Sequence, residues 1–202
     1  MLVISPHPDD ETLAAGGLIA SQRRRGVEVV LVAVTDGENA YANGKGLGEV
    51  RRKEQSDAAA WLGVDEDHIV RLGLPDSDVV SHEGELVDRL LPLVTSETHI
   101  VAPWIGDFHP DHIACGRAAE EVARRKGATL TGYFFWTWHR GTPDVLEGLD
   151  LRSFHLSPEM LEAKLEALHC HRSQLVHESG EPILPESLLD PAKRLFEVFL
   201  IS

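Results

Sequence analysis

A mainly parallel α/β sheet, covered on both faces by helices, is predicted by the alternation of two kinds of segment. Short β-branched runs alternate along the chain with longer segments of helical periodicity. Segments of that length serve as the crossovers that parallel strands need. The chain has 202 residues and a hydrophobic content of 43%, which is enough for one core. We therefore expect one Rossmann-like domain spanning residues 1–202.

The elements follow from these runs in order. The predicted strands are Leu2–Ser5, Val27–Val34, His68–Leu72, His99–Pro103 and Leu130–Trp136. The predicted helices are Asp10–Arg25, Glu49–Leu62, Glu83–Ser96, Asp111–Lys126 and a helix that begins at Ser157-Pro158-Glu159 and leads to His171. Glycines follow the first, second and fourth helices, as is typical of helix ends. Ser157 is suited to cap its helix, with proline in the first turn. The last fifty residues are less regular.

Composition excludes several classes of partner. With 19 basic and 33 acidic side chains, the net charge of −14 gives no general attraction to nucleic acid or anionic lipid. No apolar run approaches the roughly 20 residues of a membrane span. The two cysteines are far apart and predict neither a disulfide framework nor a thiolate zinc site. No signal peptide precedes the first strand, so we expect a cytoplasmic protein.

Two histidine motifs carry most of the chemical information. They are Ser5-Pro6-His7-Pro8-Asp9-Asp10-Glu11 and Asp107-Phe108-His109-Pro110-Asp111-His112, and each follows a predicted strand. Thr35-Asp36-Gly37-Glu38 follows another strand. In open α/β sheets, ligands bind beyond the carboxyl ends of the strands, so we expect these polar clusters to face one crevice. A dinucleotide site would instead have a glycine-rich turn after the first strand, which is missing here.

The spacing of the residues within each motif indicates a different role for each of them. Residues three apart lie on one side of a helix, whereas neighbours diverge by about 100°. His7 and Asp10 can therefore face one ion, with Asp9 beside it. His109 and His112 pair in the same way, so that one can bind the ion while the other reaches over a substrate. Two imidazoles, one carboxylate and open positions suit a catalytic zinc ion, for which Asp9 would be the base.

A plainer interpretation is that these carboxylates cap helices. Asp9 or Asp10 is suited to cap the first helix, and Asp111 the fourth. For one isolated aspartate, capping is the better explanation. The clustering of such groups at several strand ends favours a site instead.

The motifs resemble the PIG-L/LmbE family of zinc-dependent N-acetylglucosaminyl deacetylases. Beyond the two histidine motifs, the resemblance covers Thr35-Asp36-Gly37-Glu38, Arg51-Arg52-Lys53-Glu54, Leu72-Gly73-Leu74-Pro75-Asp76 and Lys164 through His171-Arg172-Ser173-Gln174. It thus spans nearly the whole chain. It implies an LmbE-like fold and a small N-acetylated sugar as the substrate.

The resemblance also implies roles at the metal. Zinc is expected on His7, Asp10 and His112, and Fe²⁺, Co²⁺ or Mn²⁺ are further candidates because availability decides occupancy. Asp9 matches the general base. His109, in its protonated form, matches the group that stabilises the oxyanion or protonates the amine.

Other residues are expected in supporting roles. Asp111 is expected to orient a histidine through a hydrogen bond, and Glu11 to give structural support. The resemblance implies that Arg51 contacts substrate hydroxyl groups with help from Asp36. Trp104, Trp136 and Trp138 lie near strand ends, where either sugar stacking or packing is open to them, and packing is the commoner use.

The predicted function is hydrolysis of the acetamide of an N-acetylated amino sugar or sugar conjugate. One alternative is an amidase that acts on larger sugar-thiol conjugates. A second is a non-haem iron oxygenase, whose His-x-Asp spacing occurs at His7-Pro8-Asp9 and His109-Pro110-Asp111, although such sites are usual on all-β barrels. A third is a non-catalytic sugar- or metal-binding module. A homo-oligomer is compatible with all of these, and substrate choice depends on the loops 37–48, 137–150 and 177–189.

Overall fold

The structure is a computed structural model that describes residues 1–41, 45–176 and 180–201. Its strands are β1 (Leu2–Ser5), β2 (Val30–Ala33), β3 (Ile69–Arg71), β4 (His99–Pro103), β5 (Thr129–Tyr133), β6 (Leu151–His155) and β7 (Phe196–Ile201). Its helices are α1 (Asp10–Arg24), α2 (Leu47–Trp61), α3 (Glu83–Leu90), α4 (Pro110–Lys126), α5 (Thr137–Arg140), α6 (Pro158–Cys170), α7 (Arg172–Leu175) and α8 (Glu186–Leu189). Each helix in the described part of the chain is too short or too polar to cross a membrane.

One seven-stranded sheet organises the molecule, in the order β3-β2-β1-β4-β5-β7-β6. The first five strands of this order run parallel, and β7 pairs antiparallel with both β5 and β6. The predicted α/β class with a mainly parallel sheet is therefore confirmed. The chain leaves β1 toward β2 and β3 and later fills the other side with β4 and β5. The gap between β1 and β4 is consequently the topological switch point, where ligands bind in open sheets.

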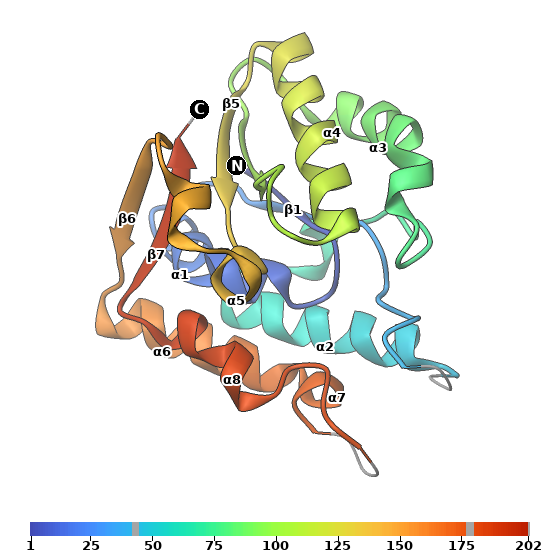
Figure 1. The fold of residues 1–202 in the computed structure, drawn as a ribbon, viewed down its shortest axis with the longest axis vertical. Coiled ribbons are helices and arrows are strands. Elements are labelled where there is room, and N and C mark those ends of the chain that lie inside the picture. Colours follow the sequence, from blue (N-terminus) through green and yellow to red (C-terminus); the bar gives the residue numbers. More distant parts are fainter. Residues whose placement is uncertain (42–44, 177–179, 202) are drawn as a thin grey trace.

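Helices cover both faces of the sheet. Figure 1 shows α3 and α4 packed together on one face and α1, α2 and α6 on the other. Alternate residues of one strand enter different cores: Ile4 of β1 packs on the α3–α4 side, whereas Val3 joins the core with α1 and α2. This alternation is the expected pattern for a strand buried on both faces.

Several predicted boundaries differ from the observed ones for identifiable reasons. The helix expected at Glu83–Ser96 ends at Leu90 and continues only as a 3₁₀ turn, because Pro92 has no N–H to donate. The strand expected to reach Trp136 ends at Tyr133, because the N–H groups of Phe135 and Trp136 turn to the carboxylate of Asp107. The antiparallel strands β6 and β7 were not predicted.

Candidate metal centre and active site

The two histidine motifs meet at the switch point, as their placement after β1 and β4 predicts. They border a cavity that is open to solvent. The polar and charged residues that line it include His7, Asp9, Asp10, Arg51, Asp76 and His109. Trp136, Ile183 and Leu184 form an apolar part of its wall. A cavity with a few convergent polar groups is the usual form of a small-molecule site.

His7, Asp10 and His112 bring their potential ligand atoms together. Asp10 Oδ2 lies 3.2 Å from His7 Nδ1 and 3.2 Å from His112 Nε2. The three donors come from the loop before α1, the first turn of α1 and the first turn of α4. They form one of two groups in the described chain with metal-binding spacing, and the other is His7, His109 and Asp111.

The state of His112 indicates that this donor set fits a metal ion. Its Nε2 atom is buried and makes no hydrogen bond with a described residue, although it faces the Asp10 carboxylate. Burial opposes a charge on this ring, but Asp10 and Asp107 outweigh burial and raise the pKa of His112 to about 9. The same negative surroundings that favour a proton on this ring would favour a cation at Nε2, where a metal ion would take the place of the proton. Two imidazoles and one carboxylate are a usual donor set for catalytic zinc.

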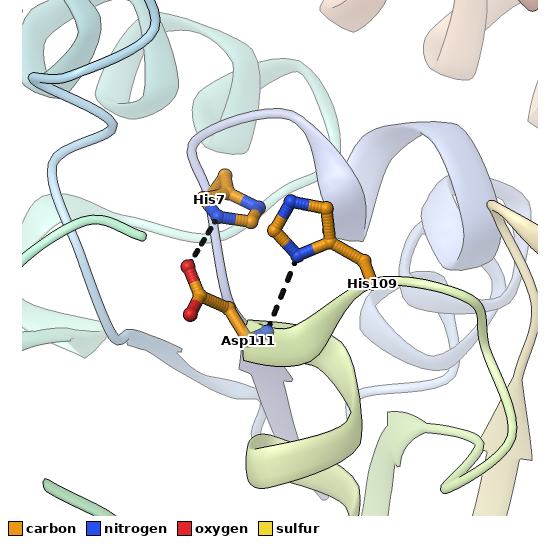
Figure 2. A group of neighbouring side chains, drawn as sticks. All are labelled: His7, His109 and Asp111. Atoms are coloured by element: carbon orange, nitrogen blue, oxygen red, sulfur yellow. Dashed lines mark hydrogen bonds and ion pairs between the residues drawn. The ribbon is translucent and has the colours of Figure 1, made fainter. Parts of the chain in front are cut away.

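Two further carboxylates orient the histidines. The Asp107 carboxylate lies 2.8 Å from His112 Nδ1 and also accepts hydrogen bonds from the Thr137 amide and hydroxyl groups. Asp111 Oδ2 lies 3.1 Å from His7 Nε2 and accepts from the Ser77 amide (Figure 2). Asp111 therefore contacts a histidine and does not cap α4 with its carboxylate. Such partners hold ring orientation and tautomer in metal sites.

Asp9 lies beside the donor set in an unusual backbone conformation. Its φ of 145° and ψ of −29° are rare for a residue with a side chain, and its carboxylate makes no capping bond to α1. Such a conformation costs on the order of 1–3 kcal/mol and persists only where its surroundings enforce it. Burial and the nearby Asp10 raise the pKa of Asp9 well above its ordinary value, although Arg51 at 3.8 Å opposes them. A carboxylate raised in this way is a stronger base.

His109 presents a defined tautomer to the cavity. Its Nδ1 atom accepts a hydrogen bond from the Asp111 amide at 3.2 Å, as Figure 2 shows. Since an amide only donates, Nδ1 carries no proton and the neutral ring has its proton on Nε2. Burial, followed by the charges of His7 and His112, lowers the pKa of His109 to about 4. The geometry thus favours a neutral His109 rather than the protonated ring expected from the sequence.

Of the other predicted residues, Arg51 lines the cavity, whereas Glu11 and Asp36 do not. Glu11 is buried and accepts hydrogen bonds from the Ser5 hydroxyl and Gln55 amide, outside the cavity lining. Arg51 is 2% exposed, and its Nε atom is buried without a hydrogen-bond partner among the described residues. Asp36 is not brought to the cavity, because its carboxylate pairs with Arg52 at 3.3 Å.

Three residues at the site were not assigned roles from the sequence. Asp107 belongs to the second histidine motif, yet its partners on the segment after β5 became visible only in the fold. Asp76 lines the cavity and lies 3.4 Å from His7 Nε2. Asp76 follows β3 at the same carboxyl edge of the sheet, and this position in the sequence could have indicated that it belongs to the site. Gln174 accepts a hydrogen bond from Arg51, and no local sequence pattern predicts this long-range interaction.

Parts of the loops expected to select substrate lie outside the described residues, at 42–44 and 177–179. The described remainder contributes Ala40, Ile183 and Leu184 to the cavity. Just before the loop 137–150, Trp136 stacks on His109 with ring centroids 5.8 Å apart, and Arg140 of that loop lies over the Trp136 ring. Trp104 and Trp138 both pack against Phe134 instead.

The sequence profile of the PIG-L family, described as GlcNAc-PI de-N-acetylase, matches residues 2–123. The chain belongs to this family. It is 31% identical over 193 residues to a Bacillus cereus protein named probable N-acetyl-alpha-D-glucosaminyl L-malate deacetylase 2, covering 86% of this chain and 83% of the relative. It is 27% identical over 210 residues to the diacetylchitobiose deacetylase of Thermococcus kodakarensis, covering 91% of this chain and 74% of the relative.

Solved structures of deacetylases share the fold. The N,N'-diacetylchitobiose deacetylase from Pyrococcus horikoshii superposes with a TM-score of 0.69 at 25% identity, over 88% of this chain and 71% of that structure. The teicoplanin deacetylase Orf2 superposes with a TM-score of 0.76 at 20% identity, over 98% of this chain and 96% of that structure. The resemblance read from the motifs is therefore confirmed at the level of family and fold.

Proposed function

We propose that the protein is a metal-dependent hydrolase that removes the acetyl group from an N-acetylated amino sugar joined to a second group. The observation that carries this proposal is the placement of Asp9 beside the His7, Asp10 and His112 donor set, in a cavity that His109 also lines. The names of the relatives, which refer to malate, inositol and chitobiose conjugates, support a sugar conjugate as the substrate. The mainly parallel α/β sheet argues against a non-haem iron oxygenase, whose sites are usual on all-β barrels.

His7, Asp10 and His112 would hold the metal, which we propose to be zinc, with Fe²⁺, Co²⁺ and Mn²⁺ as ions that the same donors accept. When bound, the ion supplies Lewis-acid chemistry that activates water and polarises a carbonyl group. Asp107 and Asp111 keep the two imidazoles in the orientation that this binding needs.

In the proposed hydrolysis, residues of this chain move protons and stabilise charge on the substrate. Asp9 takes a proton from the attacking water as the new C–O bond forms. His109 donates a hydrogen bond from Nε2–H to the carbonyl oxygen as that oxygen gains negative charge. The C–N bond then breaks, and the proton held by Asp9 passes to the departing nitrogen. The products are the free amine and acetate.

Substrate contacts follow from the polar lining. The Nε atom of Arg51, which has no hydrogen-bond partner among the described residues, is a donor for a sugar hydroxyl group. Trp136 contributes apolar surface to the cavity wall. Leaving a buried guanidinium donor unpaired is costly, so a hydroxyl group at this position would be favoured. We also propose that residues 1–202 act as one catalytic domain. A cytoplasmic location is supported by the free thiols of Cys115 and Cys170.

Acetate release tests the function directly. Zinc-loaded protein is assayed against N-acetylglucosamine, diacetylchitobiose and the malate and inositol glycosides of N-acetylglucosamine. We expect acetate and free amine in equal amounts from at least one conjugate, loss of turnover on chelation and recovery on adding zinc. Binding of a conjugate without acetate release would contradict the proposal and favour a binding module. Release of only larger acyl groups would favour an amidase.

A further inference from the structure

The peptide bond between Pro8 and Asp9 is held at both ends by side chains. The Pro8 carbonyl oxygen accepts hydrogen bonds from Gln174 Nε2 at 2.5 Å and from Arg51 Nη2 at 3.3 Å. The Asp9 amide donates to Glu11 Oε2 at 3.4 Å. This peptide precedes the Asp9 φ of 145°, so its orientation decides where the Asp9 carboxylate lies.

Gln174 has the donor and acceptor groups that this position requires. Its Oε1 atom accepts from Arg51 Nη2 at 2.8 Å, and its Nε2 atom faces both the Pro8 carbonyl and His171 Nδ1 at 3.2 Å. The side chain is fully buried. A carboxylate could not donate to the carbonyl, and an apolar side chain could replace neither bond. The contacts therefore use both ends of the amide.

The main chain of Gln174 connects this contact to the cavity wall. The Leu184 amide donates to the Gln174 carbonyl oxygen at 2.8 Å, and Ile183 and Leu184 line the cavity. Helix α7 is itself attached to α2, because Glu54 accepts from the Ser173 amide and hydroxyl groups at 2.7 and 2.6 Å. Gln174 lies beyond residues 2–123, which the family profile matches.

We propose that Gln174 is a positioning residue that sets the orientation of Asp9 and links it to the cavity wall at residues 183–184. The proposal rests on the proposed function in taking Asp9 as the base. Without the Gln174–Pro8 hydrogen bond, the peptide is free to leave its unusual conformation and the Asp9 carboxylate moves away from the substrate. His7, Asp10 and His112 keep their own contacts, so metal binding is retained.

Two substitutions separate the bonds of Gln174. Gln174→Met keeps the volume and loses both bonds, whereas Gln174→Glu keeps an acceptor for Arg51 but loses the donor to Pro8. We expect kcat to fall at least about tenfold in both, with KM changed less than about threefold, since a small misplacement of a reacting group slows chemistry more than binding. Ser173→Ala is the matched control, because it removes one neighbouring hydroxyl hydrogen bond while the Ser173 amide still donates to Glu54 and the Gln174 side chain is unchanged. We expect its kcat to stay within about twofold of the wild type.

Two further measurements do not depend on turnover. Hydrogen exchange of the segment 6–13 should be faster in both Gln174 variants and unchanged in Ser173→Ala, while zinc affinity stays constant in all three. Full kcat in Gln174→Glu, or a parallel loss of zinc affinity, would overturn the proposal. If Gln174→Met does not fold, Gln174→Glu carries the comparison alone. If the wild type releases no acetate, the proposed function fails, and the exchange data decide the role of Gln174 by themselves: unchanged exchange overturns it.

Discussion

The Asp107 carboxylate holds the His112 imidazole at 2.8 Å, and both side chains are fully buried. The same carboxylate accepts from the amides of Phe135, Trp136 and Thr137, so it is fixed by the segment that follows β5. The orientation of His112, a potential metal ligand, is thus fixed by the segment that follows β5.

Replacing Asp107 by asparagine should weaken metal binding without removing a ligand. The neutral amide would lack the negative charge that raises the basicity of His112, and partners of this kind typically change metal affinity about 10–100-fold, which we expect here as an increase of that size in the zinc Kd. Competition with a chromogenic chelator measures this constant. Asp150→Asn, at an exposed carboxylate paired with Arg152, is the control. An unchanged Kd in Asp107→Asn would contradict the orienting role.

Replacing Asp9 by asparagine should separate chemistry from metal binding. The amide cannot accept the proton of the attacking water, and loss of a general base typically lowers turnover about 10²–10⁴-fold. We expect this loss in kcat with one zinc ion still bound per chain, measured by acetate release and elemental analysis. Asp57→Asn, at an exposed carboxylate paired with Lys53, is the control. Full turnover in Asp9→Asn would rule out the base assignment.

His171 should make folding stability depend on pH. Burial, followed by the charge of Arg51, lowers the pKa of His171 to about 3, below its ordinary value of 6.5. The folded state therefore stays neutral where the unfolded state takes up a proton, so stability is full above pH 6.5 and falls as the pH drops from 6.5 toward 3. The expected slope from this group is about 1.4 kcal/mol per pH unit.

Urea unfolding of His171→Gln at several pH values tests that slope. The variant should lose stability less steeply than the wild type between about pH 6.5 and 4, by up to that amount per unit. His155→Gln, at an exposed histidine on β6, controls for removal of a histidine as such. Parallel stability curves for His171→Gln and the wild type would show that His171 is not the source of the slope.

Gly17 should tolerate a side chain poorly. A Cβ atom at this position would lie 2.3 Å from Leu156 Cδ2. The helix cannot easily move away, because the Gly17 amide donates a hydrogen bond to Glu197 at 2.7 Å. We expect Gly17→Ala to lower the free energy of unfolding by about 1–3 kcal/mol, as overpacking usually does. Gly84 in α3 has open space around the equivalent position, so Gly84→Ala should be neutral or slightly stabilising. Thermal unfolding of both variants compares the two sites, and equal effects would contradict the packing argument.

Local spacing was sufficient to predict which groups would lie together at the proposed metal site. His7 and Asp10 lie three residues apart at the start of α1, and the alternation of strands and helices predicted that this turn would meet the one after β4. The Gln174–Pro8 contact could not be predicted, because it joins residues 166 positions apart. Strand β7 was missed for a related reason. Its buried Glu197 interrupts the apolar pattern, and only the fold shows that Lys164 at 2.7 Å compensates that charge.

The division of the cavity between early and late parts of the chain bears on how such enzymes diversify. The groups proposed to hold a metal or move a proton all come from residues 7–112, whereas Ile183 and Leu184 line the same cavity from the last part of the chain. Substitutions at these two positions would change the shape of the cavity wall and leave the proposed metal-binding and proton-transfer side chains themselves in place. We therefore expect the preference among glycoconjugates to vary through a short apolar segment that is separate in the sequence from the residues that carry the chemistry.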